Sequence, residues 1–347
     1  MNKIRVGAIG CGYWGPNLIR NFMEIPSSTL VAVADKREDR LQQVKTWYPA
    51  VEVTDNYEDL FEMGLDAVVI ATPPATHFDI AYRCLSQGLH VLVEKPLTLS
   101  SRHSEELIRI AEMNDRTLMV GHTFEYNSAV IRLKQLIDRG ELGDVYYIDM
   151  VRANLGLFQR KLNVLWDLAP HDLSIVLYLL GMMPISVSAH GGACVQRGVH
   201  DIVYMHLSFP NNVIVHVQSS WLSPRKIRRT TVVGSQKMVV YDDIEEERIK
   251  IYDKGVNPPP YTETLEEFHW SYRYGDVITP HISFSEPLRM ECQHFLDSII
   301  NRTTPQTDGY NGLRVVQLLE AAEKSLQNGG AAQYTTPMIS TVALAGD

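Results

Sequence analysis

Short apolar runs alternate with polar, helix-like stretches through the first 120 residues. The runs are rich in valine, isoleucine and alanine, and each ends at glycine, proline or a charged residue. Near-continuous apolar runs are typical of parallel strands buried on both faces. The predicted strands are residues 4–9, 30–34, 67–71, 90–93 and 118–120.

Between these strands the pattern predicts helices, of which the clearest are residues 75–87 and 100–114. The first ends at Gly88, a common C-terminal helix signal, and the second begins at a pair of serines with acidic residues in its early turns. Strand and helix therefore alternate as βαβ units, which predicts a right-handed, doubly wound parallel sheet.

The pattern changes after about residue 121. Several strand-like segments then follow one another without helices between them, which indicates an antiparallel or mixed sheet. We expect two domains, residues 1–121 and 122–347, the second of α+β type with a mostly antiparallel sheet. Its predicted helices are residues 127–139, 167–180, 286–302 and 311–327, and its predicted strands are residues 145–151, 185–191, 201–209, 213–221, 227–233 and 237–241.

Composition narrows the class of partner. The 347 residues carry a formal net charge of −9, which argues against nucleic acid as a ligand. No run is long and apolar enough to span a membrane, and no signal peptide precedes the first strand. The four cysteines form no CxxC pair, so we expect free thiols, no metal and a cytoplasmic protein.

A glycine motif joins the first strand to a helix. Gly10, Gly12 and Gly15 match GxGxxG, and Asp35 follows at the end of the next strand. This context is typical of dinucleotide binding, with the pyrophosphate at the helix N-terminus. Asp35 favours NAD because it would accept hydrogen bonds from the ribose and repel a 2′-phosphate, although Lys36 can weaken that preference. The alternative is a glycine turn that binds nothing.

Further candidates lie at the ends of later strands, where ligands bind in such sheets. Lys95 is the strongest, because it ends a strand within Glu94-Lys95-Pro96, where a nicotinamide and its substrate would meet; the alternative is a surface lysine. The other candidate cofactor contacts are Tyr13, Trp14, Thr72, Pro73, His77, Glu94 and His122.

The stretch from Trp166 to Asp172 carries a second candidate site. Pro170 favours a helix start here, and Asp167 and His171 are four residues apart, hence on one face if the helix includes both. A histidine at a helix N-terminus is held neutral by the helix dipole, as a general base requires. The alternative is that Asp167 caps the helix and His171 is an ordinary polar residue.

Together GCGYWG, EKP, GHTFEYN and WDLAPHD make an ordered set that resembles the Gfo/Idh/MocA oxidoreductases over nearly the whole chain. The segments ANLGLFQ and RYGD resemble a narrower branch that acts on UDP-N-acetylglucosamine-uronate at C3. The resemblance implies an open-faced antiparallel sheet in the second domain, which commonly forms dimer or tetramer contacts. It also implies catalytic roles for Lys95, Asp167 and His171.

The implied reaction is oxidation of a sugar secondary alcohol. His171 accepts the hydroxyl proton, Asp167 orients the imidazole, and Lys95 stabilises negative charge on the same oxygen. A uronate or diphosphate needs donors, and the basic stretch 225–229 is either one source or a solvated strand face. The candidate substrate contacts are Lys95, Tyr126, Arg152, Asn154, Asn163, Trp166, Asp167 and His171.

Three functions remain open at this point. The first is the nucleotide-sugar 3-dehydrogenase. The second acts with NAD or NADP on a cyclitol or another sugar, or reduces a 3-keto sugar in the reverse direction. The third is an NAD-binding regulator without turnover, against which the intact Lys95, Asp167 and His171 argue.

Overall fold

The computed structural model describes residues 3–156, 158–159, 162–257 and 271–335. The chain divides into two compact units. The first unit contains residues 1–130 and 283–317, and the second contains residues 131–282 and 318–347. The segment 283–317 thus belongs with the N-terminal residues, although it follows the second unit's sheet in sequence.

The first unit is built on a six-stranded parallel sheet in the order β3-β2-β1-β4-β5-β6. The predicted parallel sheet is therefore confirmed. The edge strand β3 was missed, because its three residues include no buried side chain. The strands are β1 (Ile4–Ile9), β2 (Ser28–Ala34), β3 (Glu52–Thr54), β4 (Ala67–Ile70), β5 (His90–Glu94) and β6 (Leu118–Gly121).

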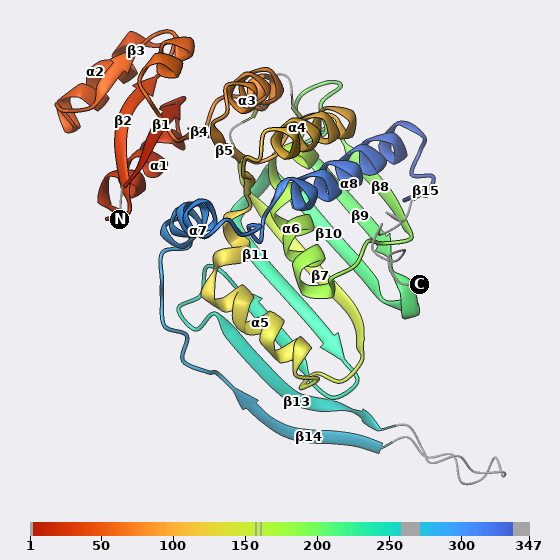
Figure 1. Cartoon of the computed structure of the whole chain (residues 1–347). Helices are drawn as coiled ribbons and strands as arrows, with labels where there is room; N and C mark the ends of the chain where they lie inside the picture. Colours follow the sequence, from red (N-terminus) through yellow and green to blue (C-terminus); the bar gives the residue numbers. More distant parts are fainter. Residues whose placement is uncertain (1–2, 157, 160–161, 258–270, 336–347) are drawn as a thin grey trace, which may run out of the picture. The chain divides into compact units, whose positions relative to one another are not determined.

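Helices connect these strands (Figure 1). The strand order reverses between β1 and β4, and in doubly wound sheets ligands bind beyond the carboxyl ends at such a point. The helices are α1 (Gly15–Glu24), α2 (Glu38–Trp47), α3 (His77–Ser86) and α4 (Ser101–Met113), with 3₁₀ turns η1 (Tyr57–Glu62), η2 (Pro74–Thr76) and η3 (Thr123–Tyr126).

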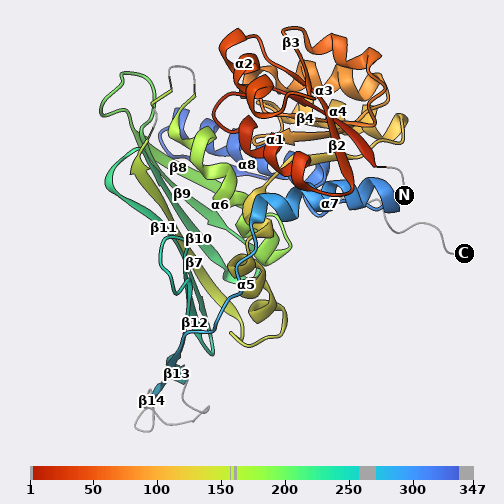
Figure 2. The ribbon, with the colours of Figure 1, turned by 90° about the vertical axis from the view of Figure 1, so that its left-hand side faces the viewer.

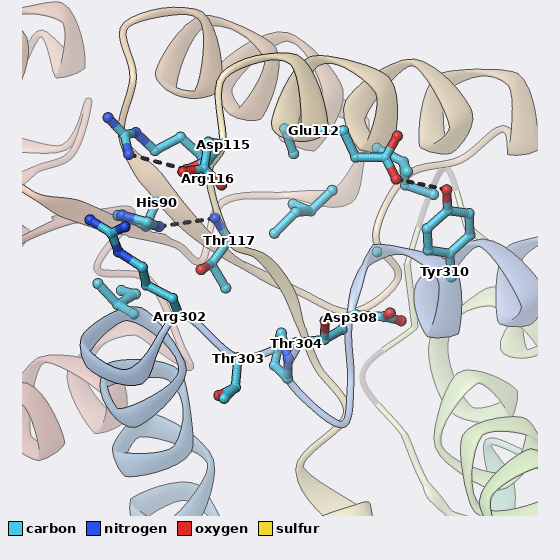
Figure 3. A pocket seen from close by; sticks show the side chains of 16 residues that line it. His90, Glu112, Asp115, Arg116, Thr117, Arg302, Thr303, Thr304, Asp308 and Tyr310 are labelled. Atoms are coloured by element: carbon cyan, nitrogen blue, oxygen red, sulfur yellow. Dashed lines mark hydrogen bonds between the residues drawn. The ribbon is translucent and has the colours of Figure 1, made fainter.

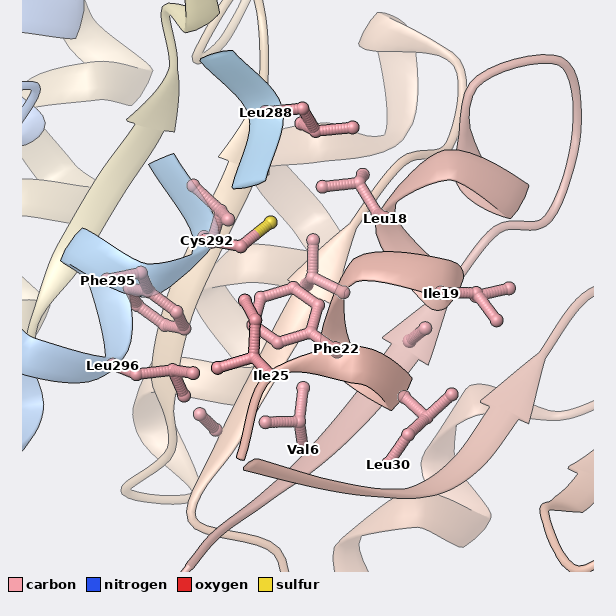
Figure 4. Packing of buried hydrophobic residues seen from close by; sticks show 14 of the residues in the cluster. Val6, Leu18, Ile19, Phe22, Ile25, Leu30, Leu288, Cys292, Phe295 and Leu296 are labelled. Carbon is pink, nitrogen blue, oxygen red and sulfur yellow. The ribbon is translucent and has the colours of Figure 1, made fainter. Parts of the chain in front are cut away.

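The helix α7 (Pro287–Asn301) completes the core of this unit by packing on α1 (Figure 4). Phe22 and Phe295 are both fully buried and meet edge to face, with ring centroids 6.5 Å apart. Cys292 and Leu296 belong to the same apolar cluster. A helix almost 300 residues along the chain therefore shields α1, which follows the glycine motif.

The second unit contains a nine-stranded sheet in the order β14-β13-β12-β11-β7-β10-β9-β8-β15. The pair β7–β10 is parallel and the other pairs are antiparallel, which confirms the predicted mostly antiparallel sheet. The strands are β7 (Val145–Leu155), β8 (Ser186–Gly192), β9 (Ile202–Ser208), β10 (Ile214–Ser220), β11 (Leu222–Gly234), β12 (Met238–Asp242), β13 (Ile249–Asn257), β14 (Ser271–Ile278) and β15 (Gln333–Tyr334).

Three of these strands, β13, β14 and β15, were not predicted. Most side chains of β14 are exposed, so it lacks the apolar alternation that would reveal a strand. Leu157 of the ANLGLFQ segment and residues 258–270 lie outside the described residues.

One face of this sheet is covered and the other is open. In β10, Val215 and Val217 are buried under α6 (Val164–Leu180), whereas Ile214 and His216 lie on the opposite, exposed face. Figure 2 shows the sheet nearly edge-on, with α5 (Ser128–Asp138) and α6 on one side. In the described part of the chain, no helix of this unit covers the other face. The remaining elements are η4 (Pro210–Asn212) and α8 (Gly309–Gln327).

Helix α6 begins earlier than predicted. The side chain of Asn163 accepts a hydrogen bond from Trp166 N and caps the helix, and Pro170 lies inside it. The predicted start at about Asp167 was therefore three residues late. An asparagine cap satisfies an N–H at the helix start, so the helix can begin six residues before the proline.

Candidate functional site

The glycine motif forms a tight turn after β1. Gly10 has a φ of +94°, and a Cβ placed on it would lie 2.7 Å from the carbonyl oxygen of Ala71. A Cβ on Gly15 would lie 2.2 Å from the Gly10 oxygen, whereas a Cβ on Gly12 would meet nothing within 4 Å. The turn thus packs tightly against β4 and leaves open space at its middle glycine, which fits the approach of a pyrophosphate.

Asp35 holds this turn in place. One of its carboxylate oxygens accepts from Cys11 N at 2.7 Å and the other from Arg37 N at 2.9 Å. The guanidinium of Arg37 pairs with Asp39 at 2.6 Å, and Lys36 is exposed. Each carboxylate oxygen has a second lone pair, so Asp35 can still accept from a ribose hydroxyl. The residues of this loop fit NAD.

The loop after β4 lies against the glycine turn. Thr76 Oγ1 donates to the carbonyl of Pro73 at 2.8 Å, which closes the loop on itself. His77 begins α3 and is fully buried, with its ring nitrogens 2.8 Å from Pro96 O and 2.9 Å from Thr72 O. Both ring nitrogens of His77 face backbone carbonyls. This placement therefore does not favour the predicted direct contact of His77 with the cofactor.

Lys95 follows β5 and precedes a cis peptide bond to Pro96. The neighbouring Glu94 accepts a hydrogen bond from Lys95 N at 3.2 Å and another from the side chain of Trp14. Burial raises the pKa of Glu94 to about 7, although the positive charge of Lys95 opposes that shift. A carboxyl group that gains and loses its proton near neutral pH therefore lies beside the predicted catalytic lysine.

Two more buried acids lie in the same unit. Thr123 Oγ1 donates to Glu291 at 2.9 Å, and Asn311 Nδ2 donates to Glu125 at 3.1 Å. Burial raises the pKa of Glu291 well above its ordinary value, and the charge of Glu94 adds to the effect. A Cβ on Gly121 would lie 3.1 Å from the Glu94 carboxylate, so glycine makes room for it. No sequence pattern indicated this acid group, because its members come from three separate segments.

His122 and Tyr126 follow β6 and are both buried. His122 Nδ1 is 2.7 Å from Asn311 Oδ1, so this nitrogen donates, and the Tyr126 hydroxyl is 3.2 Å from Thr307 Oγ1. Tyr126 belongs to the apolar core cluster of the unit. Tyr126 therefore packs in the core, and the contacts of Tyr126 with substrate and of His122 with NAD stay predictions.

In the second unit, α6 includes both Asp167 and His171, one turn apart on one face. Trp221 Nε1 donates to Asp167 Oδ2 at 2.9 Å, and the indole of Trp221 is fully buried. A Cβ on Gly156 would lie 2.3 Å from Trp221 Cδ1, so the glycine just after β7 makes room for the indole. The indole therefore sets the orientation of the carboxylate.

The helix-dipole argument for His171 was wrong. The residue lies in the third turn of α6 rather than at its N-terminus, where the dipole field acts.

Asn163 and Trp166 share an acidic partner. Asn163 Nδ2 donates to Glu323 Oε2 at 2.8 Å, and Trp166 Nε1 lies 3.3 Å from the same oxygen. These contacts tie the start of α6 to α8. The contacts show a structural role for Asn163 and Trp166. Their predicted binding of substrate stays a prediction.

Arg152 lies on the covered face of β7 with only 4% of its side chain exposed. It forms a bidentate ion pair with Asp172, with both N–O distances 2.9 Å. The positive charge of Arg152 is thus paired within the second unit. Substrate contacts of Arg152 and of the half-buried Asn154 stay predictions. The basic stretch 225–229 lies in β11, with Arg225 and Arg229 exposed as on a solvated strand face.

A hollow of about 430 Å³ lies elsewhere in the first unit, at the amino ends of β5 and β6 (Figure 3). His90 Nδ1 accepts from Thr117 N at 2.9 Å, and the Tyr310 hydroxyl donates to Glu112 at 2.8 Å. Two of the side chains that line it therefore bond to each other, and His90 bonds to the backbone. It is also at the opposite end of the strands from Lys95.

The described residues offer neither a metal site nor a membrane-spanning helix. No group of three or more histidine, cysteine, aspartate or glutamate side chains there is placed to hold a metal ion. None of the helices described has the length and apolarity needed to cross a membrane.

Comparison with known protein families assigns both parts of the chain. Residues 4–122 match the model described as "Oxidoreductase family, NAD-binding Rossmann fold", and residues 130–240 match the GFO/IDH/MocA C-terminal domain. The chain belongs to the Gfo/Idh/MocA family of NAD-dependent oxidoreductases. The expectation of an NAD-binding Rossmann domain is confirmed.

Several relatives are similar over most of the chain. An uncharacterized oxidoreductase of Escherichia coli, YdgJ, is 30% identical over 82% of both chains. The scyllo-inositol 2-dehydrogenase (NAD(+)) of Bacillus subtilis is 27% identical over 94% of this chain and 95% of its own. The UDP-N-acetylglucosamine 3-dehydrogenase of Acidithiobacillus ferrooxidans is 26% identical over 94% of this chain and 100% of its own.

The solved structure of the Acidithiobacillus ferrooxidans enzyme has the same fold. It aligns with a TM-score of 0.79 over 94% of this chain and 99% of its own, at 24% identity in the structural alignment. The inositol and nucleotide-sugar relatives are about equally distant in sequence.

Proposed function

We propose that this protein oxidises a ring secondary alcohol of a sugar or cyclitol, with NAD as the acceptor. The observation that carries the proposal is the Asp167–His171 pair on α6, with its carboxylate held by the buried Trp221. A positioned carboxylate beside an imidazole is the arrangement a general base requires. The names of the two characterised relatives, an inositol 2-dehydrogenase and a UDP-N-acetylglucosamine 3-dehydrogenase, support a ring alcohol.

Each of the three residues has a separate role in this proposal. His171 accepts the hydroxyl proton, and Asp167 orients the imidazole and stabilises its protonated form. Lys95 donates a hydrogen bond to the substrate oxygen and stabilises the negative charge that develops there. Bound NAD supplies the electron-pair acceptor at its nicotinamide ring.

For the substrate we propose a nucleotide-linked sugar oxidised at C3, such as UDP-N-acetylglucosamine-uronate. The ANLGLFQ and RYGD segments favour it by their resemblance to that branch. RYGD lies on β14, where Arg273 Nε donates to Asp253 at 3.0 Å. The second candidate is a cyclitol, which the equal similarity to the inositol enzyme supports.

We also propose that the open face of the nine-stranded sheet binds a second copy of the chain as a homodimer or homotetramer. That face carries exposed apolar and aromatic side chains, among them Tyr147, Tyr204 and Ile214. Exposed apolar groups on a sheet face are typical of an interaction surface.

The test is to load purified protein with NAD and follow the absorbance of reduced nicotinamide. UDP-N-acetylglucosamine-uronate, UDP-N-acetylglucosamine and scyllo-inositol are added separately, and His171→Ala and Lys95→Ala run beside the wild type. We expect reduction by the wild type with the nucleotide-uronate, and a kcat lower by about 10²–10⁴-fold in His171→Ala.

The variants also need a binding control. Titration calorimetry with NAD should give the same Kd for His171→Ala as for the wild type, because His171 has no role in holding the cofactor. Reduction of NAD with scyllo-inositol alone would mean that the substrate is a cyclitol and not a nucleotide sugar. Equal turnover in His171→Ala and wild type would refute the assignment of the base.

A further inference from the structure

His77 occupies an unusual place between two loops of the first unit. It is the first residue of α3, and none of its surface is exposed. Its Nε2 lies 2.9 Å from the carbonyl oxygen of Thr72, in the loop after β4. Its Nδ1 lies 2.8 Å from the carbonyl oxygen of Pro96, in the loop after β5. One side chain therefore joins the backbones of two loops that follow different strands.

Both neighbours of the ring can only accept hydrogen bonds. A neutral imidazole carries one N–H, so it donates to one carbonyl at a time, and its two tautomers serve the two loops in turn. Burial lowers the pKa of His77, whereas the carbonyls of Pro96 and Thr72 act in the opposite direction. The imidazole places a ring nitrogen at each position, and either nitrogen can carry the N–H.

The two loops have different functions in the site. The Thr72 loop packs against the glycine turn, because a Cβ on Gly10 would lie 2.9 Å from Thr72 N. The Pro96 loop carries Lys95 immediately before the cis bond. A shift of the first loop would disturb the dinucleotide turn, and a shift of the second would move the predicted catalytic ammonium.

We propose that His77 is a positioning residue that ties the dinucleotide-binding loop at Thr72 to the Lys95–Pro96 segment through its two ring nitrogens. The proposal rests on the function proposed above for Lys95. It gives a role to a histidine that cannot reach a ligand directly, since its ring is enclosed by the protein. Small misplacements of a catalytic group are costly, because reaction requires close alignment.

Two substitutions separate the two contacts. The amide nitrogen of His77→Asn can take the place of Nδ1 and keep the contact with Pro96, and the longer His77→Gln can take the place of Nε2 and keep the contact with Thr72. We expect His77→Asn to raise the NAD Kd about tenfold with kcat at saturating NAD little changed, and His77→Gln to lower kcat about tenfold with the NAD Kd little changed.

Hydrogen exchange measured by mass spectrometry tests whether each variant loosens a different loop, and it does not depend on turnover. We expect faster exchange in residues 71–76 for His77→Asn and in residues 94–99 for His77→Gln. The control is His90→Asn, which replaces a half-buried histidine at the other end of β5 and should change neither segment. If the wild type shows no turnover with any tested alcohol, the function proposed for Lys95 fails while the exchange and NAD titrations still test the tie.

The proposal is overturned if the two variants loosen the same segment, or if both lose stability equally with no split between NAD affinity and kcat. It is also overturned if only one of the two segments responds, because His77 would then anchor a single loop. Melting temperatures of both variants establish that the comparison is made on folded protein.

Discussion

The two units build their candidate residues in different ways. In the first unit the glycine turn, the candidate site for the dinucleotide, is made of backbone and is held by glycines and by Asp35 at the switch point of a parallel sheet. In the second, Asp167 and His171 are side chains on a helix, and the orientation of Asp167 depends on Trp221 from the end of a sheet strand. A backbone site leaves a local sequence signature, whereas a side-chain site depends on partners that only the fold supplies.

The buried ion pair of the second unit should give the largest effect on stability. Arg152→Met leaves Asp172 buried without its bidentate partner and should lower the free energy of unfolding by about 3–5 kcal/mol. Urea unfolding measures the change. The double variant Arg152→Met/Asp172→Leu removes both charges and should recover most of the loss. A single variant as stable as the wild type would show that the pair does not hold β7 to α6.

Substitutions in the glycine turn are the corresponding test of the first unit. Gly15→Ala forces a methyl group within 2.2 Å of a backbone oxygen and should cost about 1–3 kcal/mol of stability together with most of the NAD affinity. Gly12→Ala meets no protein atom, so it should keep the melting temperature and lose NAD affinity alone.

Calorimetry with NAD and thermal unfolding of both glycine variants provide the measurement. If Gly12→Ala binds NAD as tightly as the wild type, the open space at Gly12 is not where the pyrophosphate approaches.

Trp221→Phe tests whether the proposed catalytic pair of Asp167 and His171 depends on the hydrogen bond from Trp221. Trp221→Phe keeps a buried aromatic ring and removes the N–H that Asp167 accepts. A lost hydrogen bond to a charged acceptor is worth about 1.5–3 kcal/mol, so we expect a decrease in kcat of roughly ten- to a hundredfold with the NAD Kd unchanged. Tyr204→Phe, on an exposed face of the same sheet, is the control and should leave kcat intact.

The smallest effect concerns His90, which lies at the hollow of the first unit. Burial, with a contribution from Arg116, lowers its pKa to about 4, and its Nδ1 accepts from Thr117 N. Between pH 6.5 and 4 the unfolded chain therefore binds more protons than the folded one. The contribution of neutral His90 to the free energy of unfolding is complete above pH 6.5 and decreases as the pH falls to 4.

His90→Asn keeps an acceptor for Thr117 N and does not titrate. We expect the variant to match the wild type at pH 7.5 and to lose less stability on acidification, measured as melting temperature against pH. Parallel curves for the two proteins would contradict the neutral, accepting state of His90.

Prediction from the sequence succeeded where periodicity and glycine chemistry were strong. The five longest strands of the parallel sheet, both sheet types and the glycine turn were all predicted. β14 was missed because its side chains are mostly exposed, and the start of α6 was misplaced because Pro170 was given more weight than the capping Asn163.

The sequence by itself determined the strand and helix pattern of the first unit and its dinucleotide turn, because buried parallel strands and tight turns restrict which residues can occupy each position. Only the tertiary structure decided that α7 completes the core around Phe22, that Trp221 holds Asp167, and that His77 joins two loops. The physical reason is distance along the chain: Asp167 and Trp221 are 54 residues apart, and His122 and Asn311 are 189 apart. Hydrophobic periodicity specifies which face of an element is buried, whereas the topology of the sheets specifies which polar side chains meet there.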